Sequence, residues 1–156
     1  MMADFHCLLK AAIACLALGV AHATWADPPA RVGRVSFLDG TVSFKIPADP
    51  QWIQATLNFP VATGAAILTG ANSLAEIQIG SSALRMEQVT KLEFSELDDH
   101  TIQILLGQGT VAIRLRNLDR GESFKVITLD GVTVSPLSAG RYRVDSPRPN
   151  QPLRVT

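Results

Sequence analysis

The sequence predicts an all-β protein, and three observations support this prediction. Apolar and polar residues alternate over many short runs, as Ile102 and Ile104 alternate with Thr101 and Gln103. Turn-forming residues separate these runs at intervals of about 8 to 12 residues. No window carries apolar residues at sustained helical spacing. We therefore expect an antiparallel β sandwich or roll of about ten short strands, with a solenoid-like stack of the strands as the alternative.

The first 26 residues have the three-part layout of a secretory signal peptide. Lys10 supplies positive charge, an apolar run covers residues 11–20, and small residues follow. We expect a signal helix that is cleaved after Ala26, with Ala23 as the alternative position. A membrane anchor would need about 20 consecutive apolar residues, and polar residues end this run too early. Lipidation at Cys15 is disfavoured because this cysteine lies within the apolar run rather than at its end.

Composition limits what the mature chain, from Asp27 onward, can do. Both cysteines of the sequence, Cys7 and Cys15, belong to the signal segment, so a core must hold the exported domain together without disulfides. The 14 basic and 14 acidic residues balance, and the signal segment removes one of each. Nucleic-acid binding requires surplus positive charge. We expect a periplasmic or secreted protein with no nucleic-acid partner and no membrane span after cleavage.

Turn signals divide the first part of the mature chain. Asp39 and Gly40 both tolerate positive φ, which predicts a hairpin that joins residues 34–38 to residues 41–45. The segment 47–50 has a proline at each end and predicts a loop, because proline cannot donate to a strand ladder. A further strand is expected over residues 52–57.

The remaining strands carry their apolar residues at every second position, which predicts that one face of each strand is buried. The residues expected to point inward are Ala75, Ile77, Ile79, Leu84, Met86, Leu92, Phe94, Ile102, Ile104, Val111, Ile113, Leu115, Phe124 and Val126. A polar turn is expected over residues 96–100, and residues 140–144 form the last predicted strand. Three prolines after Val144 indicate that residues 145–156 are an extended tail or linker.

Several of these segments together resemble a known family. Residues 30–44 resemble the opening of a FecR-type periplasmic domain, residues 74–86 resemble its middle, and the strands between residues 107 and 144 resemble its end. The resemblance covers residues 30–144 and implies an all-β envelope domain. In the regulators that name the family, this domain transmits the state of an outer-membrane receptor to a cytoplasmic anti-sigma segment. Because a signal peptide precedes the domain here, the chain looks like the stand-alone exported form.

The resemblance implies a non-catalytic interaction or signalling module with a protein partner in the cell envelope. The residues themselves also argue against an enzyme, a cofactor or a metal site. His100 is the single histidine after cleavage, and zinc sites need three or four ligands. Calcium at Glu96, Asp98 and Asp99 would lack the ligand spacing of known calcium loops. Nucleophilic catalysis would require His100 beside a serine and a group that orients it.

Four residues are candidates for a binding surface. Arg114 and Arg116 share the polar face of one predicted strand, and Arg120 follows closely. They would contact an anionic partner, or they are simply solvated. Trp52 would stack on a sugar or a partner, or it would cap the core. An alternative function, a periplasmic carbohydrate- or lipid-binding β roll, predicts an apolar groove that exposes Trp52 or Phe59.

Overall fold

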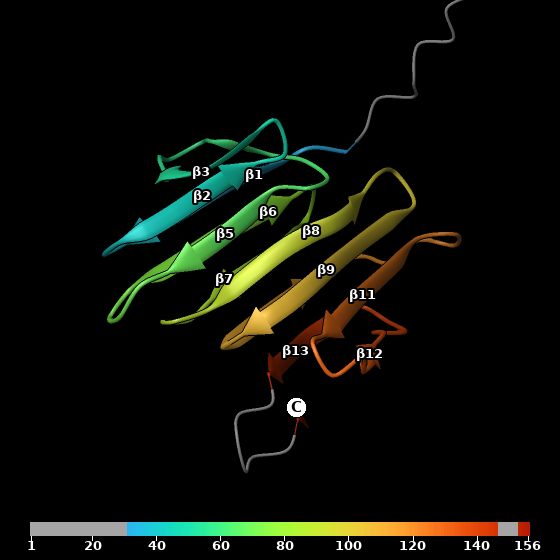
Figure 1. Ribbon diagram of the computed structural model, residues 1–156. Coiled ribbons are helices and arrows are strands. Elements are labelled where there is room, and N and C mark those ends of the chain that lie inside the picture. Colours follow the sequence, from blue (N-terminus) through green and yellow to red (C-terminus); the bar gives the residue numbers. More distant parts are fainter. Residues whose placement is uncertain (1–30, 147–152) are drawn as a thin grey trace, which may run out of the picture.

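Two seven-stranded sheets stacked face to face form the body of the protein (Figure 1). The computed structural model describes residues 31–146 and 153–156, and these residues contain fourteen strands and no helix. The prediction of an all-β sandwich is therefore confirmed. Three of the strands have only two residues, which explains the excess over the predicted number. The expected signal helix and its cleavage positions lie outside the described residues.

The first sheet, which we call sheet A, has the strand order β14-β13-β10-β7-β6-β1-β4, and all of its pairs are antiparallel. Its strands are β1 (Gly33–Asp39), β4 (Pro60–Val61), β6 (Leu74–Ile79), β7 (Ser82–Met86), β10 (Thr110–Leu115), β13 (Gly140–Asp145) and β14 (Arg154–Val155).

The second sheet, sheet B, has the order β12-β11-β9-β8-β5-β2-β3. Its strands are β2 (Val42–Ile46), β3 (Asp49–Gln54), β5 (Ala66–Thr69), β8 (Lys91–Leu97), β9 (Thr101–Gln108), β11 (Ser123–Thr128) and β12 (Thr133–Val134). One pair, β9 with β11, is parallel. The expectation of a purely antiparallel arrangement is wrong for this pair, because the chain visits sheet A through β10 before it returns to sheet B.

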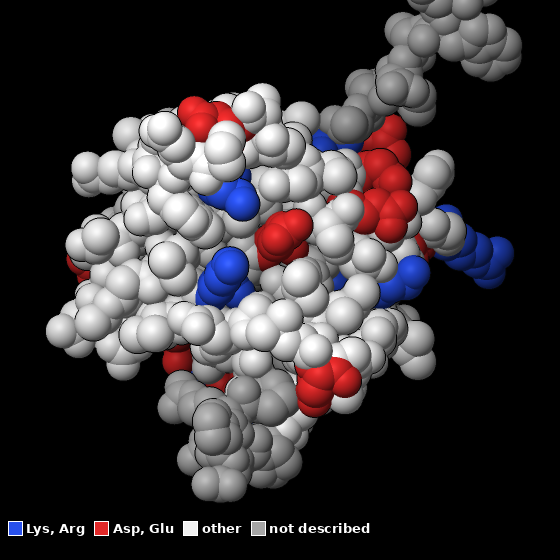
Figure 2. All heavy atoms as spheres, in the orientation of Figure 1, with Lys and Arg blue, Asp and Glu red and all other residues white. Residues whose placement is uncertain are grey.

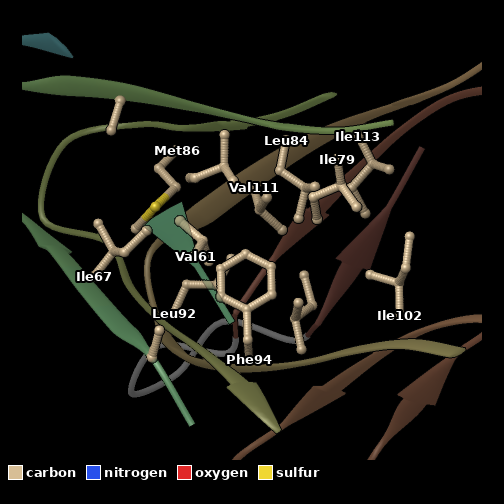
Figure 3. Packing of buried hydrophobic residues seen from close by; sticks show 14 of the residues in the cluster. Val61, Ile67, Ile79, Leu84, Met86, Leu92, Phe94, Ile102, Val111 and Ile113 are labelled. Atoms are coloured by element: carbon tan, nitrogen blue, oxygen red, sulfur yellow. The ribbon is translucent and has the colours of Figure 1, made fainter. Parts of the chain in front are cut away.

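One apolar core fills the space between the sheets (Figure 3). Every residue that the alternation predicted to point inward is buried, with at most 5% of its surface exposed. Phe94 lies near the middle of this layer, with Leu84 and Met86 of sheet A across from it (Figure 3). Side chains from two inner faces that interdigitate in this way are characteristic of a β sandwich.

The predicted hairpin at Asp39-Gly40 is wrong. Strand β1 pairs with β4 and β6 in sheet A, whereas β2 pairs with β3 and β5 in sheet B. The chain therefore crosses between the layers at this point instead of folding back beside itself. Gly40 has a φ of 74°, and a Cβ on it would lie 2.5 Å from Ser73 Oγ. The positive φ that suggests a hairpin serves a corner between sheets equally well.

Two segments whose prolines predicted a loop and a tail also differ from expectation. Asp49 and Pro50 begin strand β3 instead of belonging to a loop, and β3 is the edge strand of sheet B, where proline is tolerated. In the segment expected to be a tail, Arg154 and Val155 return to pair with the end of β13. The C-terminal residues therefore extend sheet A.

Buried threonines satisfy the backbone where three strands meet at one end of the sandwich. Thr69 Oγ1 accepts a hydrogen bond from the Thr90 backbone N–H at 2.9 Å, and Thr90 Oγ1 accepts one from the Thr110 N–H at 3.0 Å. All three residues are at most 4% exposed. Buried backbone groups need partners of this kind, so these hydroxyls stabilise the corners where the chain passes between sheets.

The corner between β9 and β10 gives a test of this arrangement. Gly109 has a φ of 85°, and a Cβ there would lie 2.6 Å from Thr90 Cα. Gly131 has a φ of 83° but no atom within 4 Å of such a Cβ. Gly131→Ala should cost about 1 kcal/mol for the left-handed backbone alone, and Gly109→Ala should cost clearly more in urea unfolding. Equal losses would contradict the packed corner.

Candidate functional site

A hollow with a volume of about 680 Å³ lies on the outer face of sheet A. Strands β6, β7, β10 and β13 form its floor, and most of its lining is polar or charged. The lining residues are Glu76, Gln78, Gly80, Ser81, Ala83, Arg85, Ala112, Ile113, Arg114, Arg116, Arg141 and Tyr142. Since the opposite face of the same strands is buried in the core, this face is the one left for solvent or a partner.

The hollow exists because small and large side chains alternate on its floor. Ala112 of β10 lies opposite Arg85 of β7, and Ala83 of β7 lies opposite Arg114 of β10. Each arginine therefore stands beside an alanine on the neighbouring strand. The short alanine side chains leave a depression that the longer arginine side chains surround.

Arginines from neighbouring strands converge on this depression. Arg141 of β13 lies directly opposite Arg114 of β10. Arg116 comes two residues after Arg114, directly after the end of β10, and lines the same hollow. Like charges directly opposite each other in an antiparallel pair are destabilising. No salt bridge within residues 31–146 and 153–156 involves Arg114, Arg116 or Arg141. The site thus concentrates positive charge without an internal counter-charge beside these three residues.

One carboxylate lies at the rim of the hollow. Glu76 accepts a hydrogen bond from Arg85 at 3.2 Å and one from the Ser36 hydroxyl at 3.2 Å. Its charge is therefore compensated by Arg85, whose side chain is 60% exposed. A pair this exposed contributes little to stability, but it occupies the one acidic group in the lining.

A second charged cluster flanks the hollow along β13. Arg143 forms ion pairs with Glu87 and with Asp145, and Thr110 Oγ1 donates to Asp145 at 2.6 Å. Hydrogen bonds to Glu87 and Asp145 raise the pKa of Arg143. Burial acts to raise the pKa of Asp145, but hydrogen bonds from Thr110 and Arg143 outweigh it and lower that pKa. This cluster is internally satisfied and ties β10 to β13.

The structure brings together only two of the four predicted surface residues. Arg114 and Arg116 line the hollow, whereas Arg120 lies in the loop after β10 and lines a separate hollow of about 350 Å³. Trp52 lies on β3 at the far edge of sheet B, with Lys45 Nζ 5.8 Å from its ring centroid. Trp52 is 40% exposed, so it does not cap the core.

The two aromatic residues named for the alternative function lie in different surroundings. Phe59 is half-buried and packs on Phe44 in the core, with 4.5 Å between ring centroids. Trp52 has only exposed neighbours along its own strand. These two rings therefore do not share a binding surface.

His100 lies in the turn between β8 and β9, which covers residues 98–100; Glu96 and Leu97, which were expected in this turn, belong to the end of β8 instead. Asp98 accepts hydrogen bonds from the backbone N–H groups of His100, at 2.7 Å, and Thr101, at 2.6 Å, and these bonds lower the pKa of Asp98. The described part of the chain holds no group of three or more His, Cys, Asp or Glu side chains arranged to bind a metal ion. The same part contains no helix long and apolar enough to cross a membrane.

Comparison with protein-family models, curated proteins and solved structures found no match to this chain. The site must therefore be interpreted from its own geometry. Sequence reasoning missed Arg85 and Arg141, which belong to the same hollow as Arg114. The alternation of apolar and polar residues in their strands could have shown that both arginines point outward. It could not show that these strands are neighbours of β10.

Acid should weaken the cluster beside the hollow. A carboxylate whose pKa is lowered by folding stabilises the folded state above its unfolded pKa of about 4, and the contribution is lost as the pH falls toward the folded pKa. Asp145→Asn should therefore destabilise the protein at pH 7, and the difference from wild type should shrink below about pH 4. Urea unfolding at several pH values measures this. A difference that is constant with pH would contradict the lowered pKa of Asp145.

Neutralising an unpaired arginine should not harm the free protein. Arg114→Gln removes the repulsion from Arg141 and should raise the free energy of unfolding by about 0.2–0.5 kcal/mol. The matched change Arg85→Gln breaks the pair with Glu76 and should lower it by a similar amount. Both are compared near the urea midpoint, where extrapolation error is smallest. Greater destabilisation by Arg114→Gln would show that Arg114 has a structural role instead.

Proposed function

We propose that this protein is a non-catalytic, exported module of FecR type that binds a protein partner in the bacterial envelope through the outer face of sheet A. The observation that carries the proposal is the convergence of Arg85, Arg114, Arg116 and Arg141 on one hollow. Arginine is enriched at protein interfaces and recognises carboxylates with two parallel hydrogen bonds. The predicted signal peptide and the resemblance over residues 30–144 support the proposed location and the proposed family.

The character of the hollow favours a macromolecular surface over a small molecule. Pockets that enclose small ligands are mainly apolar with a few polar groups, whereas this lining is dominated by arginine, glutamine and glutamate side chains. The hollow also spans four neighbouring strands of an exposed sheet. A partner that lies across the sheet would contact all of them at once.

The other side of the sandwich offers a natural comparison. Figure 2 shows the face that sheet B presents, where basic and acidic side chains are scattered over a largely uncharged surface. In this view the basic side chains at the right-hand end lie close to a group of acidic side chains. Sheet B is therefore the internal control for a test of sheet A.

Photo-crosslinking in intact cells tests the proposal. Ser81 is exposed and lines the hollow, and Ser95 is exposed on β8 in sheet B. A photoreactive residue at position 81 should capture a partner protein in the periplasmic fraction, whereas the same residue at position 95 should not. The protein that carries the photoreactive residue should itself begin at Asp27 in these cells, as expected for cleavage after Ala26.

A second comparison distinguishes specific capture from chance contact. Capture from position 81 should be lost when Arg114→Gln and Arg141→Gln are combined, and it should persist with Arg120→Gln, which removes the same type of charge outside the hollow. Equal capture from both positions, or capture that survives the double substitution, would refute the proposed surface. Retention of an unprocessed chain in the cytoplasm would refute export.

A further inference from the structure

The positions of the arginines contain information about the shape of the partner. Arg114 lies on β10, and Arg116 directly follows the last residue of this strand, Leu115; both line the hollow. Because an extended chain rises about 3.4 Å per residue, their Cα atoms are about 7 Å apart. Across the sheet, Arg141 lies opposite Arg114 on the adjacent strand. The arginine side chains therefore start from Cα atoms that are spread over the face of the sheet.

Arginines that are spread over a sheet in this way suit several anionic groups better than one. A single phosphate or sulfate would neutralise only part of this charge, because the arginines that surround the hollow start from three strands, β7, β10 and β13. The spacing along β10 equals the distance between alternate residues of an extended peptide, whose side chains at those positions point to the same side. Carboxylates on alternate residues would match Arg114 and Arg116 in turn.

We propose that the hollow binds an extended acidic peptide segment, with Asp or Glu at alternate positions, that lies along β10. This inference rests on the proposed function and specifies the part of the partner that is recognised. The peptide carboxylates would place counter-charges between Arg114 and Arg141, whose repulsion the free protein leaves uncompensated. Ala83 and Ala112 provide the room for the peptide side chains between the arginines.

Two other kinds of ligand, sugar polymers and membrane surfaces, fit the hollow less well. Sugar polymers are commonly held by exposed aromatic faces, but Tyr142 packs against the core and donates its hydroxyl hydrogen to the Ser138 carbonyl at 2.9 Å. A membrane surface attracts clusters of basic residues on protruding segments, whereas these arginines surround a depression. A peptide chain is narrow enough to enter it.

Titration of the mature protein with two synthetic peptides tests the inference. Both peptides contain the same numbers of aspartate and threonine, alternating in one and grouped into an acidic and a neutral block in the other. The alternating peptide should bind more tightly by about fivefold or more, and combined Arg114→Gln and Arg141→Gln should weaken its binding roughly tenfold. Arg120→Gln should leave it unchanged, and circular dichroism checks that each variant is folded.

The remaining outcomes would overturn the inference. Equal affinity for the two peptides would mean that charge alone is recognised, and tighter binding of galacturonate oligomers, inorganic phosphate or anionic phosphatidylglycerol vesicles would assign the hollow to a different ligand. Binding that the double substitution does not weaken would place the peptide elsewhere. If position 81 still captures a protein partner while the alternating peptide fails, the proposed function stands and the extended acidic segment does not.

Discussion

Packing of two sheets through one shared apolar layer is the constraint on which the rest of this structure depends. Residues 31–146 and 153–156 contain no cysteine, so this part of the chain is held together by burial and hydrogen bonds and not by disulfides. Each strand of four or more residues except the edge strand β3 contributes buried residues to the core, in which Phe44, Phe94 and Phe124 are fully enclosed. The outer faces are consequently released from the demands of packing, and their side chains can be selected for interactions outside the chain.

The corners between the sheets are the places where this architecture is most demanding. The chain crosses repeatedly from one layer to the other, and each crossing leaves backbone groups near the end of the core. The hydroxyls of Thr69, Thr90 and Thr110 satisfy several of these groups, and Gly109 allows the close approach of the backbone to Thr90. The corners therefore allow the chain to pass between the sheets without leaving these backbone groups unpaired.

The hollow on sheet A forms where outward side chains of neighbouring strands meet. Few of its residues could be predicted from the sequence. Arg114 and Arg116 were identified because they lie two residues apart in one predicted strand, where alternation places them on one side; in the structure β10 ends at Leu115, and Arg116 follows it. Arg85 and Arg141 are distant in sequence, so their proximity depends on the pairing of β10 with β7 and β13. Arg120 is near Arg116 in sequence but lines a separate hollow. Proximity along the chain was therefore misleading for Arg120.

The sequence by itself determined the class of the fold and the buried face of nearly every strand, because a period of two is a local property that each segment carries alone. An exception is β1, where a bulge between Val35 and Phe37 leaves Phe37 42% exposed. Only the tertiary structure decided the partners of each strand, including the crossing at Asp39-Gly40 and the parallel pairing of β9 with β11. Partner choice depends on how all the apolar faces fit into one layer, and no short segment contains that information.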